Sequence, residues 1–420
     1  MDSQEMIQVL ENIGKKARRA SAALAVLPPE AKEACLNNMA DALLASADII
    51  AQANAKDIAN ARNNGMDEAK IDRLTLTAER ISGMAEGLRQ VAAQSDPVGR
   101  VLSENIRPNG LKITKVAVPF GVIGIIYEAR PNVTADAAGI CIKAGNAVIL
   151  RGGKEAFESN TAIAAILNAS AARSGLPDGI VQLIPWTDRE AVKMMLKMDR
   201  YIDLVIPRGG EGLIRTVVAE ATMPVLKHYK GVCHLFVDAE CDVAQAVKII
   251  ANAKCSRPAV CNALETLLID RSIVETFAPV IAAELQSRNV ELRGDSTFCK
   301  YVPAALPASD EDYHAEYLSL ILAVKTVDGV DEAVEHINTY GSKHSDGILS
   351  TISENIEYFT RNVDSSTVYV NASTRFTDGG EFGMGAEIGI STDKLHARGP
   401  MGTDELTTYK YIVRGEGQIR

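Results

Sequence analysis

The first 95 residues place apolar side chains at intervals of three and four, as in Ile7, Leu10 and Ile13. This spacing puts them on one face of a helix. Alanine, the strongest helix former, is abundant over the same stretch. The pattern therefore predicts a run of amphipathic helices over about residues 1–95.

The pattern changes to alternation after Val101. Residues 111–118 alternate apolar and polar side chains, and they follow the turn-forming residues Pro108, Asn109 and Gly110. A period of two is typical of a half-buried strand, and such a turn joins two strands. A β-hairpin or arm is expected here.

Short apolar runs then alternate with helical segments. The expected strands cover residues 122–126, 147–150, 181–184 and 204–206, and the expected helices cover about 134–144, 159–174 and 188–198. Strands separated by helices of this length indicate βαβ units with a parallel sheet that is covered on both faces. The predicted fold class is α/β, doubly wound.

A second α/β series follows. Its expected strands cover residues 233–237, 264–269 and 320–326, and its expected helices about 242–254, 273–287 and 332–339. The last 55 residues return to strand-like sequence at 367–371 and 407–413, around a glycine-rich loop at 379–389. A length of 420 residues fits two or three domains.

Composition and charge exclude several classes of partner. The chain carries 44 Lys and Arg against 54 Asp and Glu, a net charge of -10, which disfavours a nucleic-acid backbone or an anionic membrane as the main partner. The most apolar segment, residues 116–127, contains Pro119 and is shorter than the roughly 18 apolar residues that span a bilayer. We expect neither nucleic acid nor membrane as a partner.

The cysteines and the N-terminus indicate a reducing compartment. Seven cysteines are scattered along a chain too long to need disulfide bonds. The first residues lack the basic stretch and apolar run of a signal peptide. A cytoplasmic location is expected.

Cys261 is the first candidate for chemistry. It lies between an expected helix and an expected strand, close to Pro258 and the cation Arg257. A nucleophilic thiol needs partial exposure and positive potential. The alternative is a packing role, because free cysteine is often buried. Cys255 and Cys261, with no histidine nearby in the sequence, do not have zinc spacing, so no metal site is expected.

Two strand ends are candidates for phosphate or nucleotide binding. Residues 205–214 end a strand, place Gly209 and Gly210 in a turn and begin a helix, whose first N–H groups suit a phosphate. Such turns also use glycine for geometry alone. Arg151 and Lys154 follow another strand, at the edge where α/β sheets bind nucleotides. A solvated charged loop is the alternative.

Taken together, these segments resemble the aldehyde dehydrogenase superfamily. They follow one another in its order and at about its spacings: residues 119–124, residues 144–151, the turn at Gly209 and Gly210, and Cys261. Three further stretches resemble one branch, the γ-glutamyl phosphate reductases, namely residues 130–134, 256–262 and above all 333–348.

The resemblance implies a reduction that proceeds through a thioester, the second step of proline biosynthesis from glutamate. Cys261 would attack the acyl carbon of γ-glutamyl phosphate and expel phosphate, and NADPH would then deliver hydride to give glutamate 5-semialdehyde. In the superfamily an Asn side chain and the backbone N–H of the nucleophile hold the oxyanion. Asn132 is expected in that role, although the segment before it is two residues longer than the superfamily pattern.

One departure from the superfamily bears on the reaction. Hydrolytic members carry a Glu that activates water, whereas the matching residues 226–232 contain no carboxylate. We expect a general base for water to be missing here. That suits an acyl-phosphate reductase, in which water would waste the activated substrate.

The resemblance also assigns cofactor residues. Arg151 replaces the usual Lys near the adenosine ribose, and Lys154 stands where NAD-specific relatives often have Glu. A cation there suits a 2′-phosphate, so NADP(H) is expected. Glu316 resembles the residue that holds the nicotinamide ribose, with an exposed helix-end carboxylate as the alternative.

Three cations in the family-like stretches are candidates for the anionic groups of the substrate. These are Arg257, His344 and Arg375. Each could instead be a structural ion-pair partner.

The implied architecture has two doubly wound α/β domains and a small β arm for oligomerisation. We expect an NADP-binding domain at residues 1–98 and 117–227, a catalytic domain at 228–365, and the arm with the C-terminal strands at 99–116 and 366–420. The edge of such an arm is normally paired with a second subunit, so a homodimer or tetramer is expected. Glutamate 5-kinase, which makes the unstable substrate, is a second candidate partner.

Two other functions stay open at this point. One is a thioester-forming reductase acting on an acyl-coenzyme A, against which residues 333–348 speak. The other is a non-enzymatic protein that keeps the fold, in which Cys261 would be dispensable. An intact Cys261 beside Arg257 and Asn262 speaks against it.

Overall fold

The computed structural model describes residues 3–420, which divide into two compact units. Unit 1 contains the chain up to Lys227 together with residues 383–389 and 400–420. Unit 2 contains His228–Phe382 and Ile390–Gly399.

Unit 1 is built on a parallel sheet of four strands. In the order β5-β4-β3-β6, these are β5 (Val181–Leu183), β4 (Ala147–Gly152), β3 (Val122–Tyr127) and β6 (Leu204–Arg208). Every residue of β3 is buried, as expected for a parallel strand covered on both faces. The chain winds first from β3 towards β5 and then back to β6, so the sheet is doubly wound.

Nine α-helices of unit 1 are described, and the five before residue 95 confirm the run predicted from periodicity. The side chains of Asp67 and Thr77 cap the fourth and fifth by accepting backbone N–H groups. Among residues 3–420, none of the helices is both long and apolar enough to cross a membrane. The helices are α1 (Ser3–Leu24), α2 (Pro29–Ala45), α3 (Ala47–Asn63), α4 (Glu68–Leu74), α5 (Ala78–Ala93), α6 (Val133–Lys143), α7 (Phe157–Arg173), α8 (Arg189–Met195) and α9 (Glu211–Glu220), with the 3-10 turn η1 (Lys154–Ala156).

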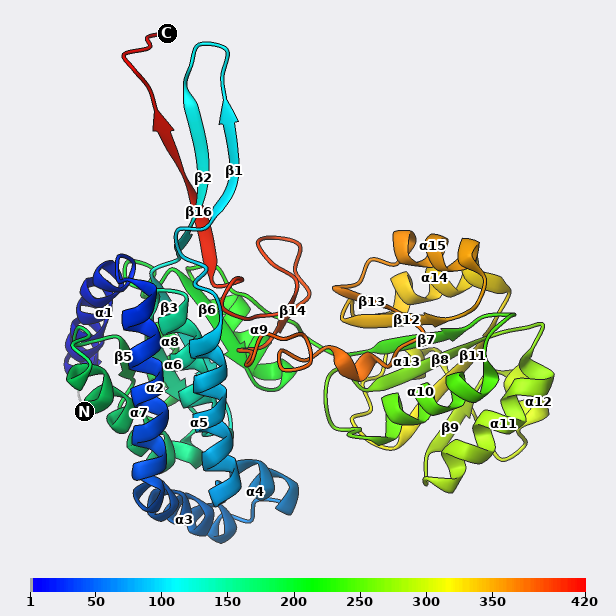
Figure 1. Ribbon diagram of the computed structural model, residues 1–420. Helices are drawn as coiled ribbons and strands as arrows, with labels where there is room; N and C mark the ends of the chain where they lie inside the picture. Colours follow the sequence, from blue (N-terminus) through cyan, green and yellow to red (C-terminus); the bar gives the residue numbers. More distant parts are fainter. Residues whose placement is uncertain (1–2) are drawn as a thin grey trace. The chain divides into compact units, whose positions relative to one another are not determined.

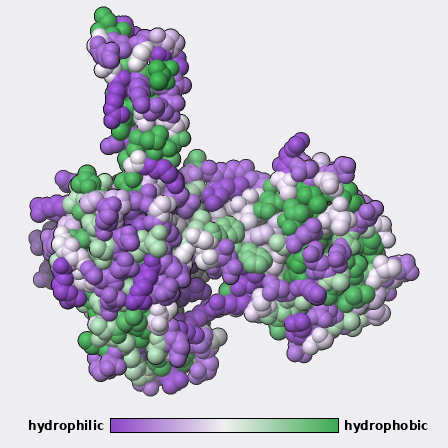
Figure 2. Space-filling view, in the orientation of Figure 1, coloured by the Kyte–Doolittle hydropathy of each residue, from purple (hydrophilic) through white to green (hydrophobic). Residues whose placement is uncertain are grey.

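The predicted hairpin is confirmed and gains a third strand. β1 (Val101–Ile106) and β16 (Thr407–Arg414) pair with the two sides of β2 (Lys112–Pro119), all antiparallel. This arm extends from unit 1 (Figure 1). Hydrophobic and hydrophilic residues are mixed on its surface (Figure 2).

Unit 2 is built on a parallel sheet of seven strands. In the order β10-β9-β11-β8-β7-β12-β13, these are β10 (Leu306–Pro307), β9 (Glu291–Gly294), β11 (Ile321–Val327), β8 (Leu264–Asp270), β7 (Cys233–Val237), β12 (Ser345–Leu349) and β13 (Thr367–Val370). The helices are α10 (Val243–Cys255), α11 (Val274–Ser287), α12 (Ser296–Tyr301), α13 (Asp310–Tyr313), α14 (Gly329–Tyr340) and α15 (Ser353–Asn362), with the 3-10 turn η2 (Thr374–Phe376). The short strands β14 (Ile390–Ser391) and β15 (Gly399–Pro400) follow.

The structure corrects the expected extent of the arm. Residues 366–420 were assigned to it, but β13 pairs in parallel with β12 and completes the sheet of unit 2. Residues 366–382 therefore belong to unit 2. Alternation identifies a strand without identifying its partner, which is why the sequence placed β13 wrongly.

Candidate active site

The candidate site lies at the amino ends of three neighbouring strands of unit 2. β7 is central, with Cys233 opposite Leu264 of β8 and His234 opposite Asp346 of β12. The residues just before these strands, including Cys261 and His344, are thereby brought together although they are far apart in the sequence.

Cys261 lies in the turn between α10 and β8, as predicted, and it is partly exposed. Its carbonyl oxygen accepts a hydrogen bond from the Cys233 thiol, with 3.3 Å between the sulfur and the oxygen. A Cβ atom on Gly231 would lie 1.8 Å from the same oxygen. Only glycine allows these two segments to approach so closely.

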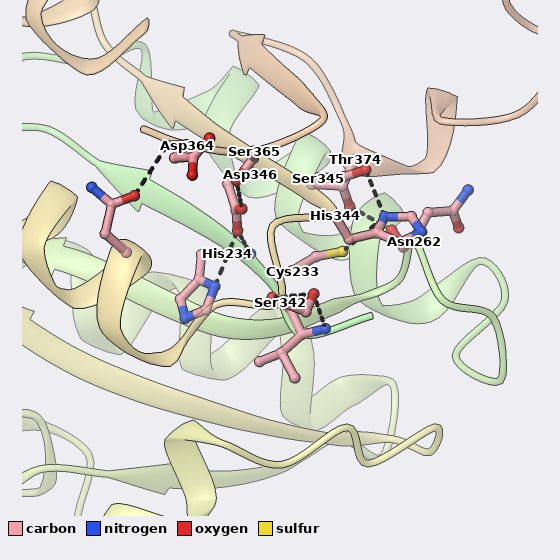
Figure 3. A network of polar contacts seen from close by, with 12 residues as sticks. Cys233, His234, Asn262, Ser342, His344, Ser345, Asp346, Asp364, Ser365 and Thr374 are labelled. Atoms are coloured by element: carbon pink, nitrogen blue, oxygen red, sulfur yellow. Dashed lines mark hydrogen bonds and ion pairs between the residues drawn. The ribbon is translucent and has the colours of Figure 1, made fainter. Parts of the chain in front are cut away.

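The turn after Cys261 is fixed by residues around η2. The Asn262 side-chain amide donates to the carbonyl oxygens of Arg375 and Thr377, at 3.2 and 2.9 Å. Thr374 Oγ1 donates to the Asn262 carbonyl at 2.7 Å. Asn262 is buried and its side chain is fully engaged in hydrogen bonds, so it fixes the backbone beside the candidate nucleophile (Figure 3).

Two histidines lie beside Cys261. One ring nitrogen each of His228 and His344 and the Cys261 sulfur all lie within 4.8 Å of one another. Nδ1 of His228 is 2.9 Å from the carbonyl oxygen of Ile390. A carbonyl only accepts, so Nδ1 carries the hydrogen and Nε2 of the neutral ring holds a lone pair.

The expectation that residues 226–232 lack a general base for water stays a prediction. That stretch has no carboxylate, but it places an imidazole next to the candidate nucleophile. His228 and Cys261 are far apart along the chain, so no local motif links them.

His344 is fully buried, and burial lowers its pKa to about 4. Burial therefore favours its neutral form near pH 7, and its expected role in holding the substrate stays a prediction. Its Nδ1 lies 2.8 Å from Ser345 Oγ and 3.8 Å from Cys233 Sγ (Figure 3). Among the described residues its Nε2 has no hydrogen-bond partner.

Cys233 is the second thiol of the site. It is fully buried, and burial raises its pKa well above the usual value. Cys233 therefore stays a thiol near pH 7, which leaves Cys261 as the candidate nucleophile.

The structure brings the other two predicted substrate cations together. Arg375 Nε donates to Ser256 Oγ at 3.2 Å, and its Nη1 donates to Asn262 Oδ1. Burial, and secondly the positive charge of Arg257, lower the pKa of Arg375. Two cations beside the Cys261 turn suit an anionic ligand.

Glu316 lies in the same unit and contacts the segment that precedes β7. Its Oε1 accepts the Gly231 N–H at 2.8 Å, and the residue is half-buried. This differs from the alternative of an exposed helix-end carboxylate. The loop around Glu316 is held by Glu265, which accepts the Leu318 N–H at 3.2 Å and pairs with buried Lys254 at 2.6 Å.

The predicted cofactor cations lie at the carboxyl edge of the unit 1 sheet. Arg151 ends β4, and its Nη2 donates to the Thr187 carbonyl at 2.6 Å. Lys154 is exposed and lines a cavity of about 430 Å³ together with Trp186 and Phe157. A cation and aromatic rings around a cavity suit a phosphorylated nucleoside.

Gly209 and Gly210 lead into α9, as the sequence predicts. The Gly210 N–H donates to Glu128 Oε2 at 3.1 Å. A Cβ on Gly209 would lie 2.7 Å from the same carboxylate. A phosphate at this helix end must therefore displace Glu128.

Asn132, the expected oxyanion donor, directly precedes α6 in unit 1. Its side-chain Nδ2 donates to Asp136 Oδ2 at 2.9 Å. Cys261 belongs to unit 2, so the role of Asn132 stays a prediction.

Comparison with known proteins decides the family. The family model "Aldehyde dehydrogenase family" matches residues 7–299. The γ-glutamyl phosphate reductase of Caldanaerobacter subterraneus subsp. tengcongensis is 55% identical over 406 residues, which cover 97% of this chain and 98% of that protein. The chain belongs to the γ-glutamyl phosphate reductases of the aldehyde dehydrogenase family.

Solved structures of the family confirm the predicted fold class. The crystal structure of γ-glutamyl phosphate reductase from Thermotoga maritima has a TM-score of 0.96 and 45% identity, covering 98% of this chain and 99% of that one. An engineered glycolyl-CoA reductase with bound NADP+ has a TM-score of 0.68 at 14% identity, covering 96% of each chain. The second likeness shows the shared aldehyde dehydrogenase fold alone.

Proposed function

We propose that this γ-glutamyl phosphate reductase family member reduces γ-glutamyl phosphate to glutamate 5-semialdehyde and phosphate with NADPH, in the cytoplasm, as the second step of proline biosynthesis. The observation that carries the proposal is the partly exposed Cys261 with His228 on one side and the Arg257–Arg375 pair close to its turn. The 55% identity to a relative of that name supports the choice of substrate.

The first step joins the substrate to Cys261. Nε2 of His228 takes the thiol proton, and the thiolate attacks the acyl carbon. The carbon–oxygen bond to phosphate breaks, and phosphate leaves with the electron pair. Arg257 and Arg375 hold anionic groups of the substrate, and Asn132 is the proposed oxyanion donor by family resemblance.

The second step reduces the thioester. NADPH, when bound, supplies the hydride that turns the thioester carbon into a hemithioacetal. Collapse of the hemithioacetal breaks the carbon–sulfur bond, releases the aldehyde and regenerates the Cys261 thiolate. Protonated His228 returns its proton to that thiolate.

The cofactor fits the residues at the carboxyl edge of unit 1. Lys154 lies at a cavity that also contains Trp186, which suits the 2′-phosphate and adenine of NADPH. Arg151 stabilises the adjoining strand end, and the turn at Gly209 and Gly210 is proposed to meet the pyrophosphate once Glu128 moves. Glu316 is proposed to hold the nicotinamide ribose.

Running the reaction backwards without phosphate tests the thioester. The protein is mixed with glutamate 5-semialdehyde and NADP+, and peptides are analysed by mass spectrometry. We expect a rapid burst of NADPH and a glutamyl adduct on Cys261, and phosphate should then remove the adduct. The matched variant Cys255→Ser should behave like the wild type. An adduct on another cysteine, or hydride transfer without any adduct, would refute the mechanism.

A further inference from the structure

We propose that His228, Cys261 and His344 form a site for a thiophilic divalent cation, Zn²⁺, that reversibly inhibits the enzyme by occupying its nucleophile. The inhibition, though not the binding, rests on the proposed function of Cys261. No metal site was expected from the sequence, because the three residues are brought together only by β7, β8 and β12.

The donor set fits zinc. One thiolate sulfur and two imidazole nitrogens are ligands that Zn²⁺ prefers over carboxylate or carbonyl oxygen. The three candidate atoms lie within 4.8 Å of one another. Bonds of about 2.0–2.3 Å in a tetrahedron need ligand atoms about 3.3–3.8 Å apart, so a contraction of at most about 1.5 Å suffices.

His344 supplies a second and independent observation. Its side chain is fully buried, and within the described part of the chain its Nε2 finds no hydrogen-bond partner. Its Nδ1 is hydrogen-bonded to Ser345 Oγ. The Ser345 hydroxyl lies 2.6 Å from Thr377 Oγ1, and the Thr377 hydroxyl lies 2.7 Å from the hydroxyl of Tyr369. This chain of hydroxyl groups fixes the ring as outer-shell partners fix a metal ligand, and leaves Nε2 for the ion.

His228 supplies the matching nitrogen. Its Nδ1–H is bound to the Ile390 carbonyl, so the Nε2 lone pair is available. Unlike His344, it is only half-buried. Small rotations of its side chain provide the contraction, and the same partial exposure lets an ion enter.

Three protein ligands leave the fourth position for water, so binding should be weaker than at a four-ligand structural site and reversible by chelators. The Cys261 thiol loses one proton to solvent as the sulfur–metal bond forms, and no electron is transferred. The ion and the acyl group require the same sulfur lone pair. Bound metal and acylation by substrate are therefore mutually exclusive.

Cobalt reports directly on such a site. The full chain is reduced, freed of metal with a chelator and titrated with Co²⁺, which should bind one equivalent and show a sulfur-to-cobalt charge-transfer band. Zn²⁺ should displace it. We expect at least tenfold weaker binding in His228→Gln and His344→Gln, and loss of the band in Cys261→Ser. The control His314→Gln, an exposed histidine of the same unit, should bind as the wild type does.

The outcomes separate the two proposals. Binding without the band, or equal binding in His228→Gln, would overturn the metal site even if the enzyme reduces γ-glutamyl phosphate. A site that binds metal in a chain without reductase activity would overturn the proposed function alone. His228 is half-buried, so its variant decides the question even if His344→Gln does not fold.

Discussion

At the scale of single residues, burial distinguishes the cysteines that stay protonated from the candidate nucleophile. Burial raises the pKa of Cys35 to about 11 and raises that of Cys141 and Cys233 further. Those groups stay protonated in the cell. Cys261 is partly exposed and lies next to the imidazole of His228, which is the proposed acceptor of its proton.

Replacing His228 tests the proposed base. His228→Gln keeps a polar side chain that can donate to the Ile390 carbonyl but removes the proton acceptor. We expect kcat/KM for γ-glutamyl phosphate to fall about 100-fold, a typical contribution of general-base catalysis. The loss should shrink as pH rises, because hydroxide then deprotonates the thiol. His314→Gln serves as the control and should keep the wild-type kcat/KM. If kcat/KM falls less than threefold in His228→Gln, His228 is not the base.

Replacing Lys154 tests the cofactor preference. Lys154→Glu puts a carboxylate where a 2′-phosphate is proposed to bind, and a carboxylate accepts from ribose hydroxyls instead. We expect the ratio of kcat/KM for NADPH over NADH to fall at least tenfold. Lys193→Glu, the same change on exposed α8, should leave the ratio unaltered. An unchanged ratio in Lys154→Glu would show that another residue selects the cofactor.

Single residues also show what the sequence could not reveal. Cys261 is predicted from its local sequence, and Arg257 and Arg375 as cations in the family-like stretches; Arg375 donates to Ser256 in the segment that carries Arg257 and Cys261. The proximity of His228 to Cys261 depends on how three strands are arranged, and the neutral state of His344 depends on its burial. Neither property is encoded in a local motif.

At the scale of elements, the site depends on how closely the segments before β7 and β8 approach. Gly231→Ala would put a methyl group into the Cys261 carbonyl, so backbone has to move. We expect kcat to fall at least tenfold and the melting temperature to drop. Gly83→Ala, at an exposed position of α5, meets no described atom within 4 Å, and it should stabilise the protein by up to about 1 kcal/mol. Unchanged kcat in Gly231→Ala would mean that this approach does not position the nucleophile.

Periodicity predicted most elements because parallel strands and amphipathic helices have strong patterns. The expected strands at 122–126, 147–150 and 233–237 correspond to β3, β4 and β7. β12 was not predicted, since Ser345, Asp346 and Gly347 interrupt its apolar pattern. Asp346 can be buried because its Oδ1 accepts hydrogen bonds from the backbone N–H and from the ring Nδ1 of His234. Periodicity does not report such a contact between strands.

At the scale of the whole molecule, the arm exposes a row of large side chains along one face of β16. Tyr409, Tyr411 and Val413 alternate along β16 and are each about half exposed or more. An arm edge with such a face is normally covered by another chain. We therefore propose a homodimer or a tetramer built from dimers.

Charges on this face should separate the subunits. The double variant Tyr411→Lys and Val413→Lys should shift the mass measured by light scattering towards the monomer. Lys410→Gln, on the opposite face of β16, should leave the mass unchanged. An oligomer that survives the double variant would place the interface elsewhere.

Glutamate 5-kinase is the second candidate partner. Co-purification of the kinase with the intact oligomer would test this association.

The fold class follows from alternating strands and helices, whereas the boundary after Lys227 is implied by the family resemblance. The chain returns to both units after residue 382, which no local pattern predicts. Long-range pairing, such as that of β16 with β2, decides these assignments.

The proposed chemistry is tested most directly by phosphate-dependent reduction of NADP+ with glutamate 5-semialdehyde, comparing wild type, Cys261→Ser and Cys255→Ser. We predict activity that requires phosphate in the wild type and in Cys255→Ser, and a loss of at least about 1,000-fold in Cys261→Ser. Activity retained in Cys261→Ser would contradict the thioester mechanism, and an inactive wild type would contradict the proposed function.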